Sequence, residues 1–215
     1  MRAGGRTYAV ASVVLAWLCA MLSGCASMSK EECLTVDWRT VGYEDGAAGY
    51  AGDRIGQHRK ACAKHGVTPD LAAYQEGRAQ GLREYCVPAN GFRLGSQGAS
   101  YRGLCPADLE GPFLSAYESG KHLYTLESRV TNASYQLESK RLELEQVEKD
   151  IVTQSALAIA NDSTAEQRAQ AVVDVKQLSE RAGRLKAEIR QLTKDKARYE
   201  RDLEDYRATL TPFTS

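Results

Sequence analysis

Large aromatic side chains and histidines are both scarce in this sequence. Aromatic residues make up 7% of the 215 residues, three of them Phe, and there are three His. The length allows one or two domains, and so few aromatic side chains supply little for a large globular core. The 28 Lys and Arg are balanced by 28 Asp and Glu, which argues against a nucleic-acid-binding protein with a strong basic field. Glycine and proline also become scarce in the charged second half, a composition typical of long helices.

The first 25 residues have the features of a bacterial lipoprotein signal peptide. Arg2 and Arg6 provide a positive start, and an uncharged apolar stretch follows from Tyr8 to Met21. About 14 residues suit a signal peptide and are too few to span a bilayer, which needs about 20. The stretch ends in Leu22-Ser23-Gly24-Cys25, which resembles a lipobox, so we expect cleavage before Cys25 and acylation of that cysteine. The alternatives are an ordinary secretory signal with a chance cysteine, or an uncleaved anchor.

Several acyl chains on Cys25 would hold the protein stably at a membrane. Ala26 follows the cysteine, whereas an Asp there commonly retains such lipoproteins at the inner membrane. The resemblance to lipoprotein signals therefore implies a periplasm-facing protein, lipid-anchored (diacylglyceryl and N-acyl, or palmitate) at the outer membrane. Loss of the signal peptide at residues 1–24 removes Arg2 and Arg6 and leaves a net charge of −2.

Four cysteines remain after lipidation, and all lie in the first half of the chain: Cys33, Cys62, Cys86 and Cys105. An even number of cysteines in an oxidising compartment predicts two disulfides, for which three connectivities exist. Each disulfide could stabilise the fold by about 2–4 kcal/mol.

Glycines recur at helical spacing between residues 37 and 124. Spacings of three and four residues put glycines on one face of a helix, where they allow the backbones of two helices to approach closely. A phosphate-binding loop is the alternative, but neither a preceding strand nor a following Lys-Ser/Thr is present. The glycines that we expect to serve packing are Gly42, Gly46, Gly49, Gly77, Gly81, Gly98 and Gly120.

Helices over residues 38–64 and 69–85 are predicted to form a hairpin around Gly66-Val67-Thr68-Pro69. In such a hairpin Cys62 lies near the turn and Cys86 returns to the start. Because a disulfide needs Cα atoms within about 7 Å, these two cysteines should not pair. We therefore favour the pair Cys33–Cys86, with Cys62–Cys105 as the second pair if the segment 92–104 runs back toward the turn.

This part of the chain resembles an uncharacterised family of small proteobacterial lipoproteins, catalogued only as containing a domain of unknown function. The resemblance covers about residues 25–124 and implies a helical, disulfide-tied domain with no assigned activity. It is carried by the lipobox together with Cys33, Asp37-Trp38, Gly42, Asp45-Gly46, Tyr74, Gly77, Gly81, Tyr85-Cys86, Gly98, Tyr101 and Leu104-Cys105-Pro106.

Two kinds of chemical site are weakly indicated in the same region. His58, Cys62 and His65 share a helical face, which is an arrangement that could bind a metal, but Cys62 is expected to be oxidised and no fourth ligand is evident. The candidate acids and bases are Asp37, Glu44, Asp45 and Glu76, none of which lies in a recognisable catalytic motif. We expect no metal, no cofactor and no enzyme activity. A hydrolase whose site forms only in the fold would need Asp45 and Glu76 near a histidine.

The second half has the apolar spacing of a coiled coil. Apolar residues alternate at three and four positions from Leu123 to Ala158, and again from Ala171 to Leu210, with polar gaps at Lys140, Gln154 and Lys196. Asn161-Asp162-Ser163 interrupts the pattern, and Ser163 with Glu166 has capping-box spacing.

Two helices of similar length, 113–160 and 164–210, favour an antiparallel hairpin with arms of about 70 Å. Residues 123–160 carry 4 basic and 6 acidic side chains, and residues 164–210 carry 11 and 9, so the arms are weakly complementary. The alternative is one continuous helix in a parallel dimer. Small alanine side chains reduce the apolar surface that two helices alone can bury in the seam, so a third helix or a second copy of the chain could be needed to bury enough. These alanines are Ala133, Ala158, Ala171 and Ala182.

The sequence thus predicts an all-α protein: a disulfide-tied, Gly-rich helical domain at 25–111, a long antiparallel coiled-coil hairpin at 112–210 and a tail at 211–215. We expect an envelope lipoprotein with a structural or adaptor role, which contacts a protein partner or itself through residues 113–210 and binds no nucleic acid. The alternative is a module at 33–110 that binds a small ligand, or a metal through His58 and His65, with the hairpin as an oligomerisation arm.

Overall fold

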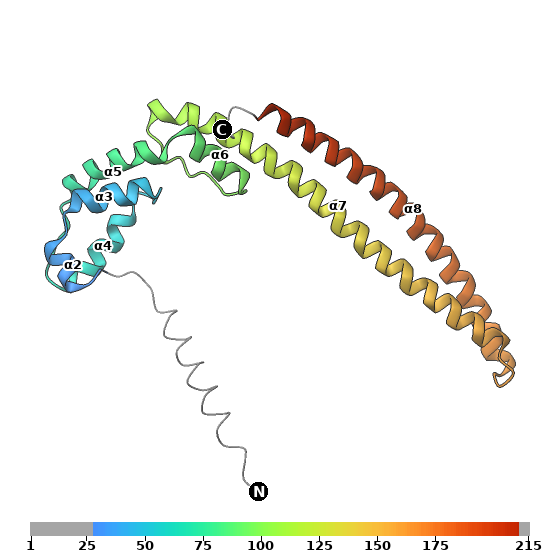
Figure 1. Ribbon diagram of the computed structural model, residues 1–215. Coiled ribbons are helices and arrows are strands. Elements are labelled where there is room, and N and C mark those ends of the chain that lie inside the picture. The colour runs from blue at the N-terminus through green and yellow to red at the C-terminus, as the bar shows by residue number, and fades with distance from the viewer. Residues whose placement is uncertain (1–27, 211–215) are drawn as a thin grey trace, which may run out of the picture. The chain divides into compact units, whose positions relative to one another are not determined.

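The computed structural model describes residues 28–210, which are helical with no strand among them. The predicted signal peptide, Cys25 and the tail lie outside these residues. In the described part of the chain no helix is both long and apolar enough to cross a membrane. Figure 1 labels the helices α2 (Lys30–Thr35), α3 (Trp38–Ala47), α4 (Arg54–Ala63), α5 (Leu71–Tyr85), α6 (Pro88–Ser96), α7 (Ala107–Ile159) and α8 (Ala165–Thr209).

The chain divides into two compact units between Tyr85 and Cys86. The sequence predicted a boundary between residues 111 and 112 instead. The difference arises because α7 is one helix that begins at Ala107 and continues through Pro112. The first part of α7 therefore belongs to the same unit as the hairpin, together with α6.

In the first unit, α3 and α5 pack with their backbones in direct contact. A Cβ atom on Gly77 would lie 1.8 Å from the carbonyl oxygen of Arg39, and one on Gly42 would lie 2.0 Å from that of Tyr74. Since no side chain fits such gaps, glycine is required on both helices. The predicted packing role is confirmed for the helical glycines, including Gly46 and Gly81.

The helix predicted over residues 38–64 is broken, and this break changes the disulfide pairing. α3 ends at Ala47, Gly49 adopts a φ of +72°, and α4 begins at Arg54. α4 therefore does not extend α3, and it brings Cys62 to Cys33 on α2 with a Cα–Cα distance of 5.4 Å. The favoured pair Cys33–Cys86 was wrong because it assumed an unbroken helix with Cys62 at its far end.

In the second unit, α6 packs on the first part of α7 through glycines as α3 packs on α5. Gly120 of α7 approaches the carbonyl oxygen of Phe92, and Gly95 of α6 approaches that of Tyr117. Cys86, just before α6, pairs with Cys105, just before α7, so the favoured pair Cys62–Cys105 was also wrong.

The two glycine-packed pairs are structural repeats of one another. In each pair a disulfide links the segment before the first helix to the connection between the two helices. Gly49 and Gly98 both have positive φ, and a Cβ on either would strike a tyrosine ring, that of Tyr85 or Tyr124. These two glycines thus serve turns rather than helix packing. The same approaches of a glycine to a backbone carbonyl occur in both units. Each contact of the first unit has a counterpart in the second: Gly42 to Tyr74 corresponds to Gly91 to Phe113, Gly46 to Arg78 corresponds to Gly95 to Tyr117, and Gly81 to Tyr43 corresponds to Gly120 to Phe92.

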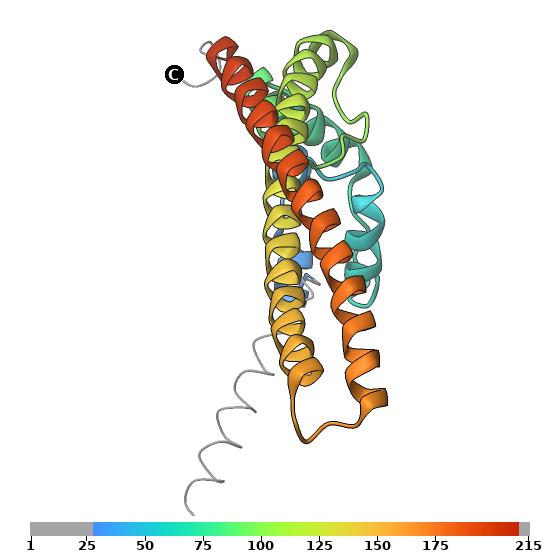
Figure 2. The ribbon, with the colours of Figure 1, turned by 90° about the vertical axis from the view of Figure 1, so that its right-hand side faces the viewer.

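The rest of α7 forms the predicted antiparallel hairpin with α8 (Figure 2). Val147, Ala182 and Leu185 are buried in its seam. Near the end of α8, the Tyr206 hydroxyl donates to the carbonyl of Ser119 at 2.8 Å, and its ring packs edge-on against His122. A continuous helix is excluded by the turn at residues 160–164, and the 45 residues of α8 span about 68 Å.

The hairpin turn and the pairing of its arms depend on polar side chains. Thr164 caps α8 in a capping box with Gln167, one residue after the predicted cap at Ser163. The predicted charge complementarity is present as ion pairs between the arms, and in three of the four the acid lies on α7. The four pairs are Glu127–Arg207, Glu143–Arg181, Glu148–Lys186 and Lys140–Glu188.

Candidate functional site

The first unit contains a buried carboxylate with three polar neighbours. Asp45 on α3 is 6% exposed. Its Oδ2 atom accepts a hydrogen bond from the Tyr74 hydroxyl at 2.7 Å and lies 2.8 Å from Nε2 of His58. Nε of Arg54 lies 3.8 Å from the other carboxylate oxygen. A buried carboxylate is costly unless it is paired in this way, so this cluster needs an explanation.

The break after α3 creates the cluster. Asp45 directly precedes Gly46, so close packing of α3 on α5 sets it opposite Tyr74. α4 then supplies Arg54 and His58. The sequence named Asp45 and His58 separately, but an unbroken helix over residues 38–64 would have carried them apart.

The second glycine-packed pair shows that this kind of helix packing can form without the cluster. By the glycine equivalences, Leu94 occupies the position of Asp45 and Phe113 the position of Tyr74. Moreover, no helix lies between α6 and α7 to correspond to α4. The same helix packing therefore forms around an apolar pair, and the polar cluster is an addition specific to the first unit.

Hydrogen bonding selects the tautomer of a neutral His58 ring. A carboxylate only accepts hydrogen bonds, so a neutral His58 donates from Nε2 and keeps Nδ1 as an acceptor. The ring is 13% exposed and lies beside the Trp38 and Tyr74 rings, at centroid distances of 6.4 and 6.2 Å. Burial, reinforced by the hydrogen bond to Asp45, raises the pKa of Tyr74 well above its usual value, so this phenol remains a donor at neutral pH.

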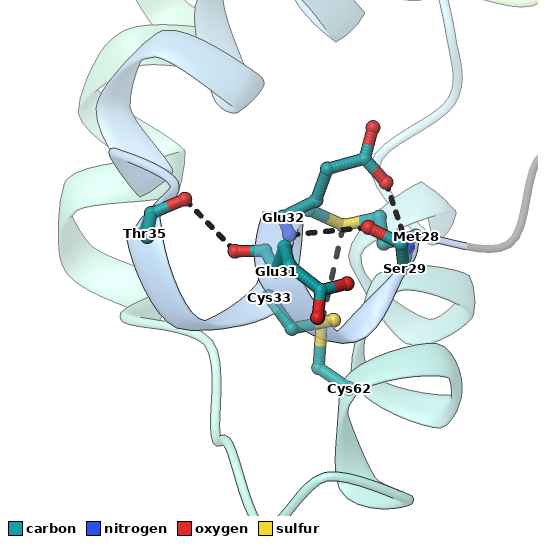
Figure 3. Close-up of a disulfide and its surroundings, with 7 residues drawn as sticks. All are labelled: Met28, Ser29, Glu31, Glu32, Cys33, Thr35 and Cys62. Carbon is teal, nitrogen blue, oxygen red and sulfur yellow. Dashed lines mark hydrogen bonds between the residues drawn. A yellow bond between two sulfur atoms is a disulfide. The ribbon is translucent and has the colours of Figure 1, made fainter.

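An open pocket of about 410 Å³ lies beside the cluster, and part of its wall comes from α2. Met28, Val36 and Val41 give the pocket an apolar side. Figure 3 shows how α2 is held: Ser29 and Glu32 form a reciprocal capping box, and Cys33 is bonded to Cys62 beneath Met28. The disulfide thus fixes α2 against α4, two of the three helices that line the pocket, the third being α3.

Three carboxylates and one guanidinium line the pocket, together with His58 and the Thr35 side chain. Asp45 faces Arg54, whereas Glu32 and Glu44 form no ion pair with any residue from 28 to 210. The pocket therefore carries an excess of negative charge. The capping bonds from the Ser29 backbone and hydroxyl lower the pKa of Glu32, which keeps it ionised at neutral pH.

The other predicted acid and base residues lie elsewhere. Asp37 caps α3, where hydrogen bonds from Thr40 and the Arg39 backbone lower its pKa. Glu76 pairs with Arg39 at 2.5 Å on the surface, and both side chains are about half exposed. Asp45 therefore meets a histidine, but Glu76 does not join it, so the arrangement that the hydrolase alternative would need is not formed among these residues.

Two of the three side chains of the metal-binding alternative have other partners in the fold. Cys62 is oxidised in a disulfide, and His58 is bonded to Asp45. Over residues 28–210, no group of three or more His, Cys, Asp or Glu side chains is placed to hold a metal ion.

The hairpin presents a different kind of surface. Val152 and Ile159 on α7 are 70% and 82% exposed, and Val172 and Val173 near the start of α8 are also exposed. These side chains lie near the turn, away from the seam. A shallow depression of about 450 Å³ nearby is lined mainly by polar residues, including Asp150 and Arg184.

Comparison with known families gives a match to part of the chain. Residues 37–122 match the model of a family described as protein of unknown function (DUF2799). These residues are therefore similar to that family, and the match covers less than half of the chain. The DUF2799 region begins at the cap of α3 and ends within α7, so it includes both glycine-packed pairs and the Asp45 cluster. No curated protein and no solved structure matches the chain.

Proposed function

We propose that the protein is a periplasm-facing lipoprotein of the outer membrane, anchored through Cys25, which acts as a non-enzymatic adaptor. Its hairpin would dock a partner protein that presents an apolar groove. The observation that supports docking is the exposed set Val152, Ile159, Val172 and Val173 near the hairpin turn. Apolar side chains gathered at one end of a long helical pair are typical of a protein contact surface.

The anchor is supported by the order of the N-terminal signals: basic residues, an apolar stretch, then Leu22-Ser23-Gly24-Cys25. Mass spectrometry of the purified protein tests it. We expect a mature chain that begins at Cys25 with acyl modification, and a Cys25→Ala variant that is not acylated. An N-terminus elsewhere, or an unmodified Cys25, would refute the anchor.

Substitution near the hairpin turn tests docking. Val152→Glu with Ile159→Glu should abolish recovery of the partner with the protein, because charge on the docking face cannot enter an apolar groove. Glu145→Gln, on the same helix, serves as the control. Both changed side chains are exposed in the hairpin, so the hairpin itself should keep its helicity. Equal recovery with the double variant would refute docking through this surface.

The pocket beside Asp45 favours a second candidate function, the binding of a small ligand by the first unit. The supporting observation is that Asp45 and Tyr74 replace an apolar pair that serves the second unit equally well. A buried polar cluster next to an open pocket is the usual mark of a binding site. The two functions can coexist, since the hairpin and the pocket belong to different units.

A further inference from the structure

We propose that the pocket flanked by α2 and α4 binds a primary alkylammonium group, with the alkyl part on the apolar wall and the charge on the carboxylates. This inference names the ligand for the second candidate function and rests on it. It is independent of the hairpin.

The sign of the charge comes from the two carboxylates that form no ion pair with any residue from 28 to 210. Of the charged groups that line the pocket, Asp45 is faced by Arg54 and His58, whereas within the described part of the chain Glu32 and Glu44 form no ion pair. An anionic ligand would meet two unpaired negative charges at close range. A cation would be attracted by both.

The hydrogen-bonding groups agree with this sign. The two glutamates only accept hydrogen bonds, and a neutral His58 that donates from Nε2 to Asp45 keeps Nδ1 as a further acceptor. Acceptors therefore outnumber donors along the wall, where Arg54 is the main donor. An ammonium group, which carries three donors and no acceptor, fits such a wall.

The shape of the pocket separates an organic cation from a metal ion. Met28, Val36 and Val41 are among the lining residues, and Val36 and Val41 offer no ligand to a bare ion. Over the described residues there is also no set of three ligating side chains placed around one point. An alkyl chain of a few carbons would cover these apolar side chains, and about 410 Å³ lies at the small end of ligand pockets.

The test is a titration of the full chain, purified in a non-ionic detergent, with three four-carbon probes: n-butylammonium, n-butanol and butyrate. The sequence has three histidines, so ring signals in NMR spectra can be assigned with a His58→Gln variant. We expect butylammonium to shift the His58 signal saturably, butanol to bind at least about tenfold more weakly, and butyrate to have no effect. The affinity for butylammonium should fall as salt is added, because exposed carboxylates are screened.

Charge-removing variants locate the contact. Glu32→Gln preserves the capping box, since Gln serves there as Glu does. Combined with Glu44→Gln, it should weaken butylammonium binding about fivefold or more. Glu76→Gln is the matched control, because this glutamate pairs with Arg39 away from the pocket, and it should change nothing.

Two results would overturn the inference in distinguishable ways. Tighter binding of butanol or butyrate would leave a ligand site but refute its preference for a cation. No shift of the His58 signal with any of the three probes would remove the small-ligand function itself. The probe series uses a variant only to assign the His58 signal, and substituting His65 and His122 instead identifies the same signal by elimination, so the series decides the question even if one substituted chain fails to fold.

Discussion

At the residue scale, the close approach of helices makes individual glycines indispensable. Gly77→Ala should destabilise the first unit by about 1–3 kcal/mol. The added Cβ would lie 1.8 Å from the Arg39 carbonyl oxygen, so the backbones of α3 and α5 would have to move apart. Gly56→Ala in α4 is the control, since nothing lies within 4 Å of its Cβ, and it should be neutral or slightly stabilising. Urea unfolding measures both. Equal effects would contradict the glycine packing.

The Asp45 cluster can be converted to the apolar pair of the second unit. Asp45→Leu alone leaves the Tyr74 hydroxyl and the His58 ring without their acceptor, which should cost about 1–3 kcal/mol for each stranded group. Adding Tyr74→Phe reproduces Leu94 and Phe113, and should recover part of the lost stability. If the double variant were less stable than the single one in urea unfolding, the equivalence of the two pairs would be refuted.

Tyr74 also predicts a pH dependence. Burial and its bond to Asp45 raise its pKa in the folded chain above the unfolded value of about 10, so the folded state keeps a proton that the unfolded state loses. The stabilisation is complete below pH 10 and declines as the pH rises above it, by up to about 1.4 kcal/mol per pH unit. Unfolding free energies measured between pH 8 and 11 should show this decline. Tyr74→Phe should lessen it, and an unchanged slope would contradict the assignment.

At the element scale, the disulfides tie each glycine-packed pair separately. Trypsin isolates the four cysteines in peptides 31–39, 61–64, 84–93 and 103–121. Without reduction, 31–39 should be joined to 61–64, and 84–93 to 103–121. A joined pair of 31–39 with 84–93 would contradict the fold. Replacing both Cys33 and Cys62 by Ser should cost about 3–4 kcal/mol, given a separation of 29 residues.

Helix type and face could be predicted from the sequence, whereas the break between α3 and α4 could not. The seam of the hairpin and the glycine faces follow from spacings of three and four, which local periodicity reveals. Gly49 fitted that same spacing, so it was assigned to helix packing although it adopts a positive φ in a turn. This one assignment placed α4 wrongly and changed the cysteine pairing.

The candidate site was missed for the same reason. Asp45 and His58 were each considered, but their 2.8 Å contact depends on the return of α4 after the turn at Gly49. Aligning the two repeats could have provided a signal, because Gly-x-x-Asp-Gly at 42–46 corresponds to Gly-x-x-Leu-Gly at 91–95. A charged residue at a position that is apolar in the other repeat indicates a role beyond packing.

At the scale of the whole molecule, the proposed account assigns separate tasks to separate parts of one chain. The N-terminal cysteine would anchor the protein, the first unit would hold a small ligand, and the hairpin would dock a partner through the apolar end of a pair of helices about 70 Å long. Docking of a partner protein is the central claim of this account, because it is the role proposed for the long hairpin.

Site-directed photo-crosslinking in living cells tests this claim most directly. Probes at Val152, Ile159 and Gln167 lie near the hairpin turn, and one at Glu76 in the first unit serves as the comparison. We predict one discrete adduct with another protein from the probes near the turn and none of the same mass from Glu76. Adducts of the chain with itself alone, or none from any hairpin position, would contradict the adaptor role.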